Sequence, residues 1–353
     1  MKFRFFLIFV LLAFAIFASA CAGGQGLPVS WPGLMTDGNA VYLATGQHIY
    51  SLNPSNGSEN WKFPEEPENN LSFYAAPSLG ADGQLIAGAY NNVLYSINPE
   101  DGTANAWTFE EARNRYIGSP LITDQLILAP SADTNLYALD LNGQEIWRFP
   151  TDEPLWSQPA TDGENVYIAS LDHALYAVNL ETGRETWRKD LGGAIVGTPF
   201  VADGIVYVGS FAKTLTALDA QTGAVIWTFP AKDWVWAGPV MDNDTLYFGS
   251  IDGTFYALNA QTGELIWDYV ADGRIFSTPL IANGKIYFAT ENGNFYAFNP
   301  DSELLWSETV VGKIYTSPIS VNNLILIALM ESDKLVIAYD ENKVERWSYP
   351  TSE

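Results

Sequence analysis

The sequence predicts an all-β protein, an eight-bladed β-propeller whose blades are four-stranded antiparallel sheets. Three observations predict this fold. Tryptophan recurs at intervals of about forty residues, a proline precedes each of these tryptophans by a nearly constant distance, and the segments between them alternate short apolar stretches with turn residues. Four strands in every unit of this length, repeated along the chain, are typical of a closed propeller.

The periodic tryptophans define the units. They are Trp61, Trp107, Trp147, Trp187, Trp227, Trp267, Trp306 and Trp347. The first and last units keep the pattern, which favours a closed ring over a solenoid, whose terminal repeats are normally atypical caps. We expect each of these tryptophans to dock one blade on the next, with its indole packed on the neighbouring sheet and its N–H donated to a backbone carbonyl.

The unit from Gly238 to Trp267 illustrates the predicted strands and turns. Its stretches LYFGS and FYALN are rich in β-forming residues, and ELIW closes the unit. Pairs such as Asp203-Gly204 tolerate the positive φ of tight hairpins. In the turn from Asp219 to Gly223, an Asp side chain can accept bonds from its own backbone and a glycine can take the left-handed conformation. No segment of this unit has a convincing helical period.

The beginning of the chain has the form of an export signal. Two basic residues precede the apolar run Phe5–Phe17, and the small residues Ala18–Ala20 lead to Cys21. We predict a signal peptide over 1–20, lipidation at Cys21, a linker over 21–30 and a single propeller over 31–353. Plain secretion and a retained membrane anchor are the alternatives. The prediction places the protein in the cell envelope, facing the periplasm or the exterior.

Charge and cysteine content narrow the possible partners. The formal net charge is −24, and such a surface repels the phosphates of nucleic acids and of anionic lipids. We therefore expect no nucleic-acid binding and no membrane contact beyond the N-terminal lipid. Cys21 is the only cysteine, so an exported form has no disulfide and its stability must come from its core.

The phrase Ala-x-Asp-x-x-Thr-Gly-x-x-x-Trp, which begins at Ala217, resembles the tryptophan-docking motif of quinoprotein-like propellers with PQQ-like repeats. The compact units and the lipoprotein-like start are most similar to the BamB-type lipoproteins of the outer-membrane β-barrel assembly machinery. The resemblance implies a non-catalytic interaction scaffold, a monomer within a complex, whose partner is an envelope protein or an extended peptide. It also implies a role in the assembly of outer-membrane β-barrel proteins.

An enzyme of the same fold is the alternative interpretation. Dehydrogenases of this kind that depend on pyrroloquinoline quinone (PQQ) typically have a vicinal cysteine pair and a calcium site, and this chain has no such pair. His48 and His173 are isolated and predict turn residues rather than metal ligands. We therefore predict no catalytic residues, no metal and no cofactor. A small-ligand site in the central channel and recognition of a cell-wall polysaccharide are further alternatives.

One group of residues is a candidate for binding. We expect the residues before each conserved proline to form the innermost strand, so that the third and fifth residues before the proline share a face. These positions collect aromatic and basic side chains at one mouth of the channel: Tyr74, Arg115, Trp156, Trp234, Trp236, Arg274, Phe276, Lys313 and Tyr315. They suit an extended peptide or a planar anion. The alternative is that they only plug the channel, together with the non-periodic Trp31.

Overall fold

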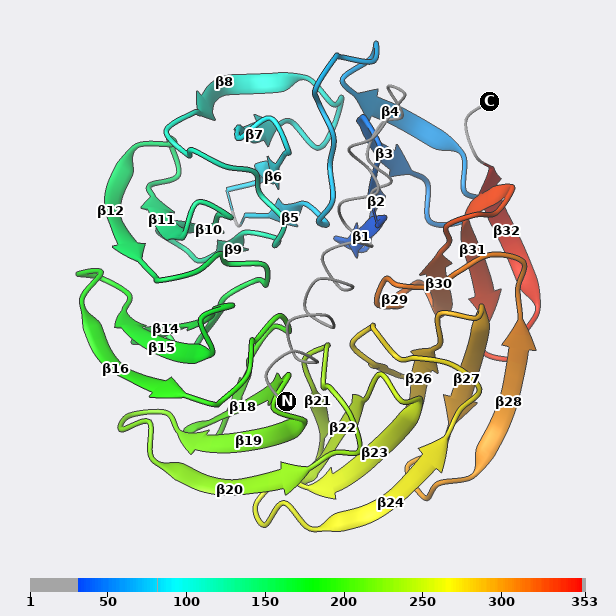
Figure 1. Cartoon of the computed structure of the whole chain (residues 1–353). Coiled ribbons are helices and arrows are strands. Elements are labelled where there is room, and N and C mark those ends of the chain that lie inside the picture. The colour runs from blue at the N-terminus through cyan, green and yellow to red at the C-terminus, as the bar shows by residue number, and fades with distance from the viewer. Residues whose placement is uncertain (1–30, 81, 351–353) are drawn as a thin grey trace, which may run out of the picture.

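The computed structural model describes residues 31–80 and 82–350, and there it forms a closed ring of eight four-stranded sheets (Figure 1). This confirms the predicted fold class. The predicted signal peptide, Cys21 and the linker lie outside the described residues. Within the described residues, no helix is long and apolar enough to cross a membrane.

The first four blades follow one another along the chain, from blue to green in Figure 1. Blade 1 comprises β1 (Gly33–Thr36), β2 (Val41–Thr45), β3 (His48–Leu52) and β4 (Glu59–Phe63). Blade 2 comprises β5 (Ser78–Leu79), β6 (Leu85–Gly88), β7 (Leu94–Ile97) and β8 (Ala104–Phe109). Blade 3 comprises β9 (Leu121–Ile122), β10 (Ile127–Pro130), β11 (Asn135–Leu139) and β12 (Glu145–Pro150). Blade 4 comprises β13 (Ala160–Thr161), β14 (Asn165–Ala169), β15 (Ala174–Asn179) and β16 (Glu185–Asp190).

The other four blades complete the ring. Blade 5 comprises β17 (Phe200–Ala202), β18 (Ile205–Ser210), β19 (Thr214–Asp219) and β20 (Val225–Pro230). Blade 6 comprises β21 (Val240–Asp242), β22 (Thr245–Gly249), β23 (Thr254–Asn259) and β24 (Leu265–Val270). Blade 7 comprises β25 (Leu280–Ala282), β26 (Lys285–Ala289), β27 (Asn294–Phe298) and β28 (Leu304–Thr309). Blade 8 comprises β29 (Ile319–Val321), β30 (Leu324–Ala328), β31 (Lys334–Asp340) and β32 (Glu345–Pro350).

The apolar core lies between blades rather than inside them. Each of the eight clusters of buried residues draws on two adjacent blades; Tyr207 and Leu215 of blade 5, for example, pack with Leu246 and Phe248 of blade 6. The two middle strands supply most of this core because both of their faces are covered, and β18 is buried along its whole length. A single blade therefore has no core of its own.

The periodic tryptophans join neighbouring blades. The indole N–H of Trp187 donates to the carbonyl of Ala220 in the next blade at 2.9 Å. Six others donate in the same way, to the carbonyls of Pro99, Leu180, Ala260, Pro300, Glu341 and Pro54. The ring also packs on the turn glycine: a Cβ on Gly223, whose φ is +68°, would lie 2.6 Å from Cε3 of Trp187.

Blade 2 makes this junction differently. The indole N–H of Trp107 donates to the side-chain oxygen of Gln84 in its own blade at 3.0 Å, and the amide of Gln84 donates to the carbonyl of Leu141 in blade 3 at 2.9 Å. Gln84 thus stands between the indole and the carbonyl of the next blade. The ring of Trp107 still packs on the turn glycine of blade 3, Gly143.

The ring closes by the same contacts, without an exchanged strand. Every blade is made of four consecutive strands. Trp347 of blade 8 donates to the carbonyl of Pro54 in blade 1 at 2.9 Å, and the hydroxyl of Tyr349 donates to Glu59 at 2.5 Å. Buried side chains of blades 1 and 8 form one cluster that includes Leu43 and Leu326. The junction between the ends of the chain is therefore a normal blade interface.

The prediction that the innermost strand precedes the conserved proline is wrong. The inner strands begin after it; β21, for example, starts at Val240. The physical reason is that the preceding segment divides its hydrogen bonds between two blades. The amide of Val235 donates to the carbonyl of Ser210 in blade 5, and the carbonyl of Trp234 accepts from the amide of Ile251 in blade 6. A segment shared in this way pairs continuously with neither sheet.

Candidate functional site

The candidate site is built from the entry segments, which connect the outer strand of one blade to the inner strand of the next. From Pro77 to Pro318, the fourth residue before each conserved proline is buried, as Val235, Ile275 and Ile314 are, whereas the third is half-buried in every unit except that of Val196, which is buried. The predicted alternation of faces therefore holds in burial, although the segments are not strands. They are crowded: a Cβ on Gly197 would lie 2.7 Å from the backbone carbon of Ala237 in the next segment.

Six aromatic side chains form a continuous aromatic cluster on the entry segments and loops of blades 5 to 8 and 1. The members are Trp31, Phe211, Trp234, Trp236, Phe276 and Tyr315. Trp236 and Phe276 meet edge to face at 5.3 Å, and Phe276 lies 5.4 Å from Tyr315. At the other end, Trp234 stacks on Phe211 at 4.5 Å. Distances and tilts of this kind are those of favourable aromatic pairs.

Trp31 bridges three members of the aromatic cluster. Its ring stacks on Tyr315 at 4.8 Å with an interplanar angle of 7°, and lies 5.9 Å from Trp236 and 6.0 Å from Phe276. The three partners come from the entry segments of blades 6, 7 and 8. A side chain at the start of blade 1 therefore contacts entry segments as far round the ring as that of blade 6.

The basic residues predicted beside these aromatics are paired with acids. Arg274 lies 3.7 Å from the carboxylate of Glu291, and Lys313 lies 3.2 Å from that of Glu331. The hydrogen bond to Glu331 raises the pKa of the Lys313 ammonium, followed by the influence of Tyr315. Both acids come from the loop between the second and third strands of the same blade. This pairing offsets the positive charge that a planar anion would need, and it favours an apolar or aromatic ligand.

Tyr74 and Arg115 lie apart from the aromatic cluster. Tyr74 stacks on Tyr90 at 4.4 Å with an angle of 5°, and the guanidinium of Arg115 lies 4.7 Å from the centre of the Tyr90 ring. Burial and the neighbouring Tyr74 raise the pKa of Tyr90. Trp156 occupies the equivalent position in the entry segment of blade 4 and is half-buried. Four of the nine predicted residues thus belong to the aromatic cluster, and Tyr74 and Arg115 meet at Tyr90.

Sequence reasoning missed Phe211 and Tyr90. Both follow the second strand of their blade, in the loop whose backbone bonds to the entry segment; the amide of Phe211 donates to the carbonyl of Ala194 at 2.9 Å. The repeat pattern could have identified both residues. Aligning the repeats places Phe211 and Tyr90 at the position held by Leu171 and Ile251 in other units, next to the entry segment.

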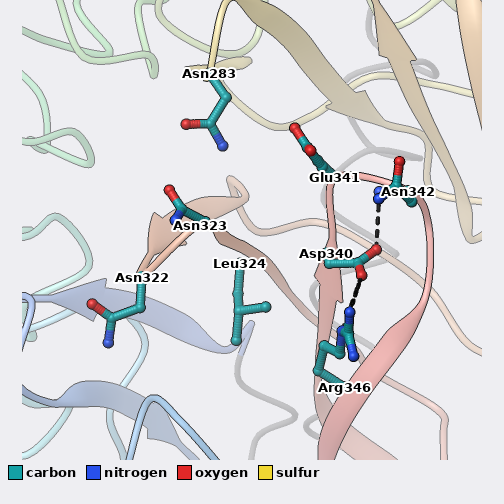
Figure 2. A pocket seen from close by; sticks show the side chains of 8 residues that line it. All are labelled: Asn283, Asn322, Asn323, Leu324, Asp340, Glu341, Asn342 and Arg346. Carbon is teal, nitrogen blue, oxygen red and sulfur yellow. Dashed lines mark hydrogen bonds and ion pairs between the residues drawn. The ribbon is translucent and has the colours of Figure 1, made fainter.

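A second feature is a pocket of about 560 Å³ among the turns of blades 7 and 8 (Figure 2). Its lining consists of Asn283, Asn322, Asn323, Leu324, Asp340, Glu341, Asn342 and Arg346. Arg346 lies 2.6 Å from Asp340, which also accepts from the amide of Asn342. Glu341 pairs with Lys285 at 3.4 Å. Each charged side chain of the lining is therefore already paired, Asp340 with Arg346 and Glu341 with Lys285 outside the lining.

The two histidines lie in separate blades. His48 opens β3 with its Nδ1 2.8 Å from the carbonyl oxygen of Pro64, and His173 holds a left-handed turn position with φ +79°. Over residues 31–80 and 82–350, no three or more His, Cys, Asp or Glu side chains gather in a way that suits a metal ion.

Comparison with known protein families identifies the family of this chain. The profile of the family described as "Outer membrane protein assembly factor BamB" matches residues 45–154, 132–233 and 212–353. The chain belongs to this family. The expected resemblance to BamB-type, PQQ-like repeat propellers is thereby confirmed. A comparison with curated protein sequences finds no match.

Solved structures share the fold at low sequence identity. BamB from Moraxella catarrhalis is 20% identical with a TM-score of 0.70, over 84% of this chain and 90% of that one. The computationally designed Ika8 protein is 13% identical with a TM-score of 0.75, over 93% and 98%. A europium-containing methanol dehydrogenase is 13% identical with a TM-score of 0.69, over 85% and 84%. These likenesses support the architecture alone.

The two acids beside the aromatic cluster do not fit a calcium ion. A calcium ion takes six to eight oxygen ligands, largely from carboxylates. The carboxylates of Glu291 and Glu331 instead pair with Arg274 and Lys313.

Proposed function

We propose that this protein is a non-catalytic, lipid-anchored scaffold of the cell envelope that holds a partner protein during the assembly of outer-membrane β-barrel proteins. The observation that carries the proposal is the match to the BamB family, which extends from residue 45 to residue 353. The export-signal pattern before Cys21 supports the location, and the acidic surface disfavours nucleic acid as the partner.

The aromatic cluster is the proposed partner-binding surface. Tryptophan and tyrosine are enriched among the residues that dominate binding energy at protein interfaces, because they present a large area at a low cost in side-chain entropy. The cluster also rests on a rigid support, since the fourth residues before the prolines anchor the entry segments in the blade cores. A rigid platform loses little conformational entropy when a partner binds.

The test is recovery of a partner from solubilised envelope with the full-length protein. We expect a specific envelope protein to co-purify with the wild type, and expect recovery to fall at least about tenfold for the double variant Trp236→Ala/Phe276→Ala. Ile266→Ala, an exposed aliphatic on outer strand β24, is the matched control and should recover the partner normally. No partner from the wild type, with dye-linked dehydrogenase activity in its place, would overturn the proposal.

Lipidation is tested separately at Cys21. Metabolic labelling with a radioactive fatty acid should mark the wild type and leave Cys21→Ser unlabelled. The variant should also move from the membrane fraction to the soluble envelope fraction. Equal labelling and membrane retention of both proteins would show a retained anchor or another attachment.

A further inference from the structure

Trp31 does not follow the pattern of the blades. The residue directly before the conserved proline is small or polar in the other seven units: Ala76, Ser119, Gln158, Thr198, Gly238, Thr278 and Ser317. Small residues suit this place because the entry segments crowd one another; a Cβ on Gly238 would lie 2.2 Å from the carbonyl oxygen of Thr198. Blade architecture therefore does not require an indole at position 31.

Trp31 directly precedes Pro32 and Gly33, the residues at which blade 1 begins to contact its neighbouring blades. The carbonyl of Pro32 accepts a hydrogen bond from the hydroxyl of Thr316, and β1 begins at Gly33, which packs closely on the backbone of Ala76. Trp31 itself belongs to no strand and is only half-buried. The strand pairing of blade 1 therefore does not depend on where the Trp31 side chain lies.

The three aromatic rings that contact Trp31 also contact one another. Trp236, Phe276 and Tyr315 contact one another in sequence at 5.3 and 5.4 Å, and the indole of Trp31 lies on all three. We name these three residues the aromatic cradle. The indole of Trp31 is stacked on one ring and tilted against two others, as in favourable aromatic pairs.

We propose that the aromatic cradle binds a tryptophan side chain of an extended partner segment, and that Trp31 is an intramolecular occupant that this segment displaces. The inference rests on the proposed function and specifies the ligand of the same aromatic cluster. Residues two apart in an extended chain lie on one face, about 6.6 Å from each other. Trp31 lies 5.9 Å from Trp236, which lies 5.3 Å from Phe211. A second aromatic residue at i+2 would therefore reach Trp236 and Phe211.

The experiment uses the full-length protein and the probe peptide N-acetyl-Trp-Thr-Trp-amide, with fluorotryptophan in the peptide so that binding is followed by fluorine NMR. An internal occupant raises the apparent Kd to the intrinsic Kd divided by the fraction of time that the site is empty. We expect Trp31→Ala to bind the probe at least about tenfold more tightly than the wild type, and Trp31→Ala/Tyr315→Ala to lose that gain. The probe with leucine in place of both tryptophans should bind neither protein.

A second measurement keeps the test valid if the double variant does not fold. Fluorotryptophan is incorporated into the wild-type protein, and the Trp31 signal is assigned by its absence in Trp31→Phe. Saturating peptide should shift this signal towards that of solvent-exposed tryptophan. Equal affinities of wild type and Trp31→Ala within twofold, or an unmoved Trp31 signal at saturation, would overturn the inference. If the envelope partner is still recovered in that case, the scaffold function stands and only the cradle is rejected.

Discussion

Substituting Gly223 by alanine tests how the blades are joined, because one added methyl group meets the docking tryptophan of the previous blade. The new Cβ would lie 2.6 Å from Cε3 of Trp187, and the backbone there has φ +68°. A left-handed conformation costs a non-glycine residue about 1–2 kcal/mol, and overpacking a buried contact costs about 1–3 kcal/mol more. We expect Gly223→Ala to lower the free energy of unfolding by about 2–5 kcal/mol.

The matched control lies in the same blade. Gly204 has φ +74°, and a Cβ there would meet no atom within 4 Å. Gly204→Ala therefore carries the backbone cost alone, about 1–2 kcal/mol. Urea-induced unfolding, followed by circular dichroism, measures both variants. The reasoning is refuted if Gly223→Ala costs no more than Gly204→Ala, because the indole would then exert no steric constraint on the turn.

Three further predictions concern other junctions and pH. Ser302 holds the left-handed turn position in blade 7 with φ of 74°, so Ser302→Gly should stabilise the protein by about 1 kcal/mol in the same urea assay. Gln84→Ala removes the acceptor of the Trp107 indole and should cost about 1–3 kcal/mol. Burial, followed by nearby carboxylates, raises the pKa of Tyr339 to about 12. Because the folded state keeps this proton and the unfolded state releases it near pH 10, stability should fall from pH 10 to 12 in alkaline titrations, and less so for Tyr339→Phe.

The fold could be predicted from the repeat because the repeated residues stabilise the turns in which they lie. In the turn after β19, Asp219 accepts from the amide and hydroxyl of Thr222 at 2.8 and 2.7 Å, as expected from the Asp-x-x-Thr-Gly phrase. Gly223 takes the expected left-handed conformation. Such interactions span only a few residues. They can therefore be predicted without knowledge of the ring.

The boundary of the innermost strand was mispredicted because it depends on neighbouring blades. The sequence around Trp234 reads as β-forming and its side chains do alternate in burial, but its backbone bonds to blade 5 on one side and blade 6 on the other. Local propensity does not distinguish one partner sheet from two. The proline that follows removes a donor, and the inner strand starts only beyond it.

The composition of the site was predictable in part. The period of the repeat is enough to place Trp236, Phe276 and Tyr315 at equivalent positions of adjacent blades. It is not enough to show that Trp31 closes on them, since that contact joins residues nearly three hundred positions apart. The pairing of Lys313 with Glu331 was also missed, because the acid comes from a loop of the same blade that bends back to the mouth.

Site-specific photocrosslinking in living cells tests the central claim most directly, that the aromatic cluster at the mouth is where the partner binds. A photoreactive amino acid is placed at Phe276 of the mouth and, as a control, at Ile266 of outer strand β24. We expect position 276 to crosslink one envelope protein and position 266 to crosslink none. Crosslinking of the same protein from position 266 alone would contradict it and assign binding to the outer edge of the ring.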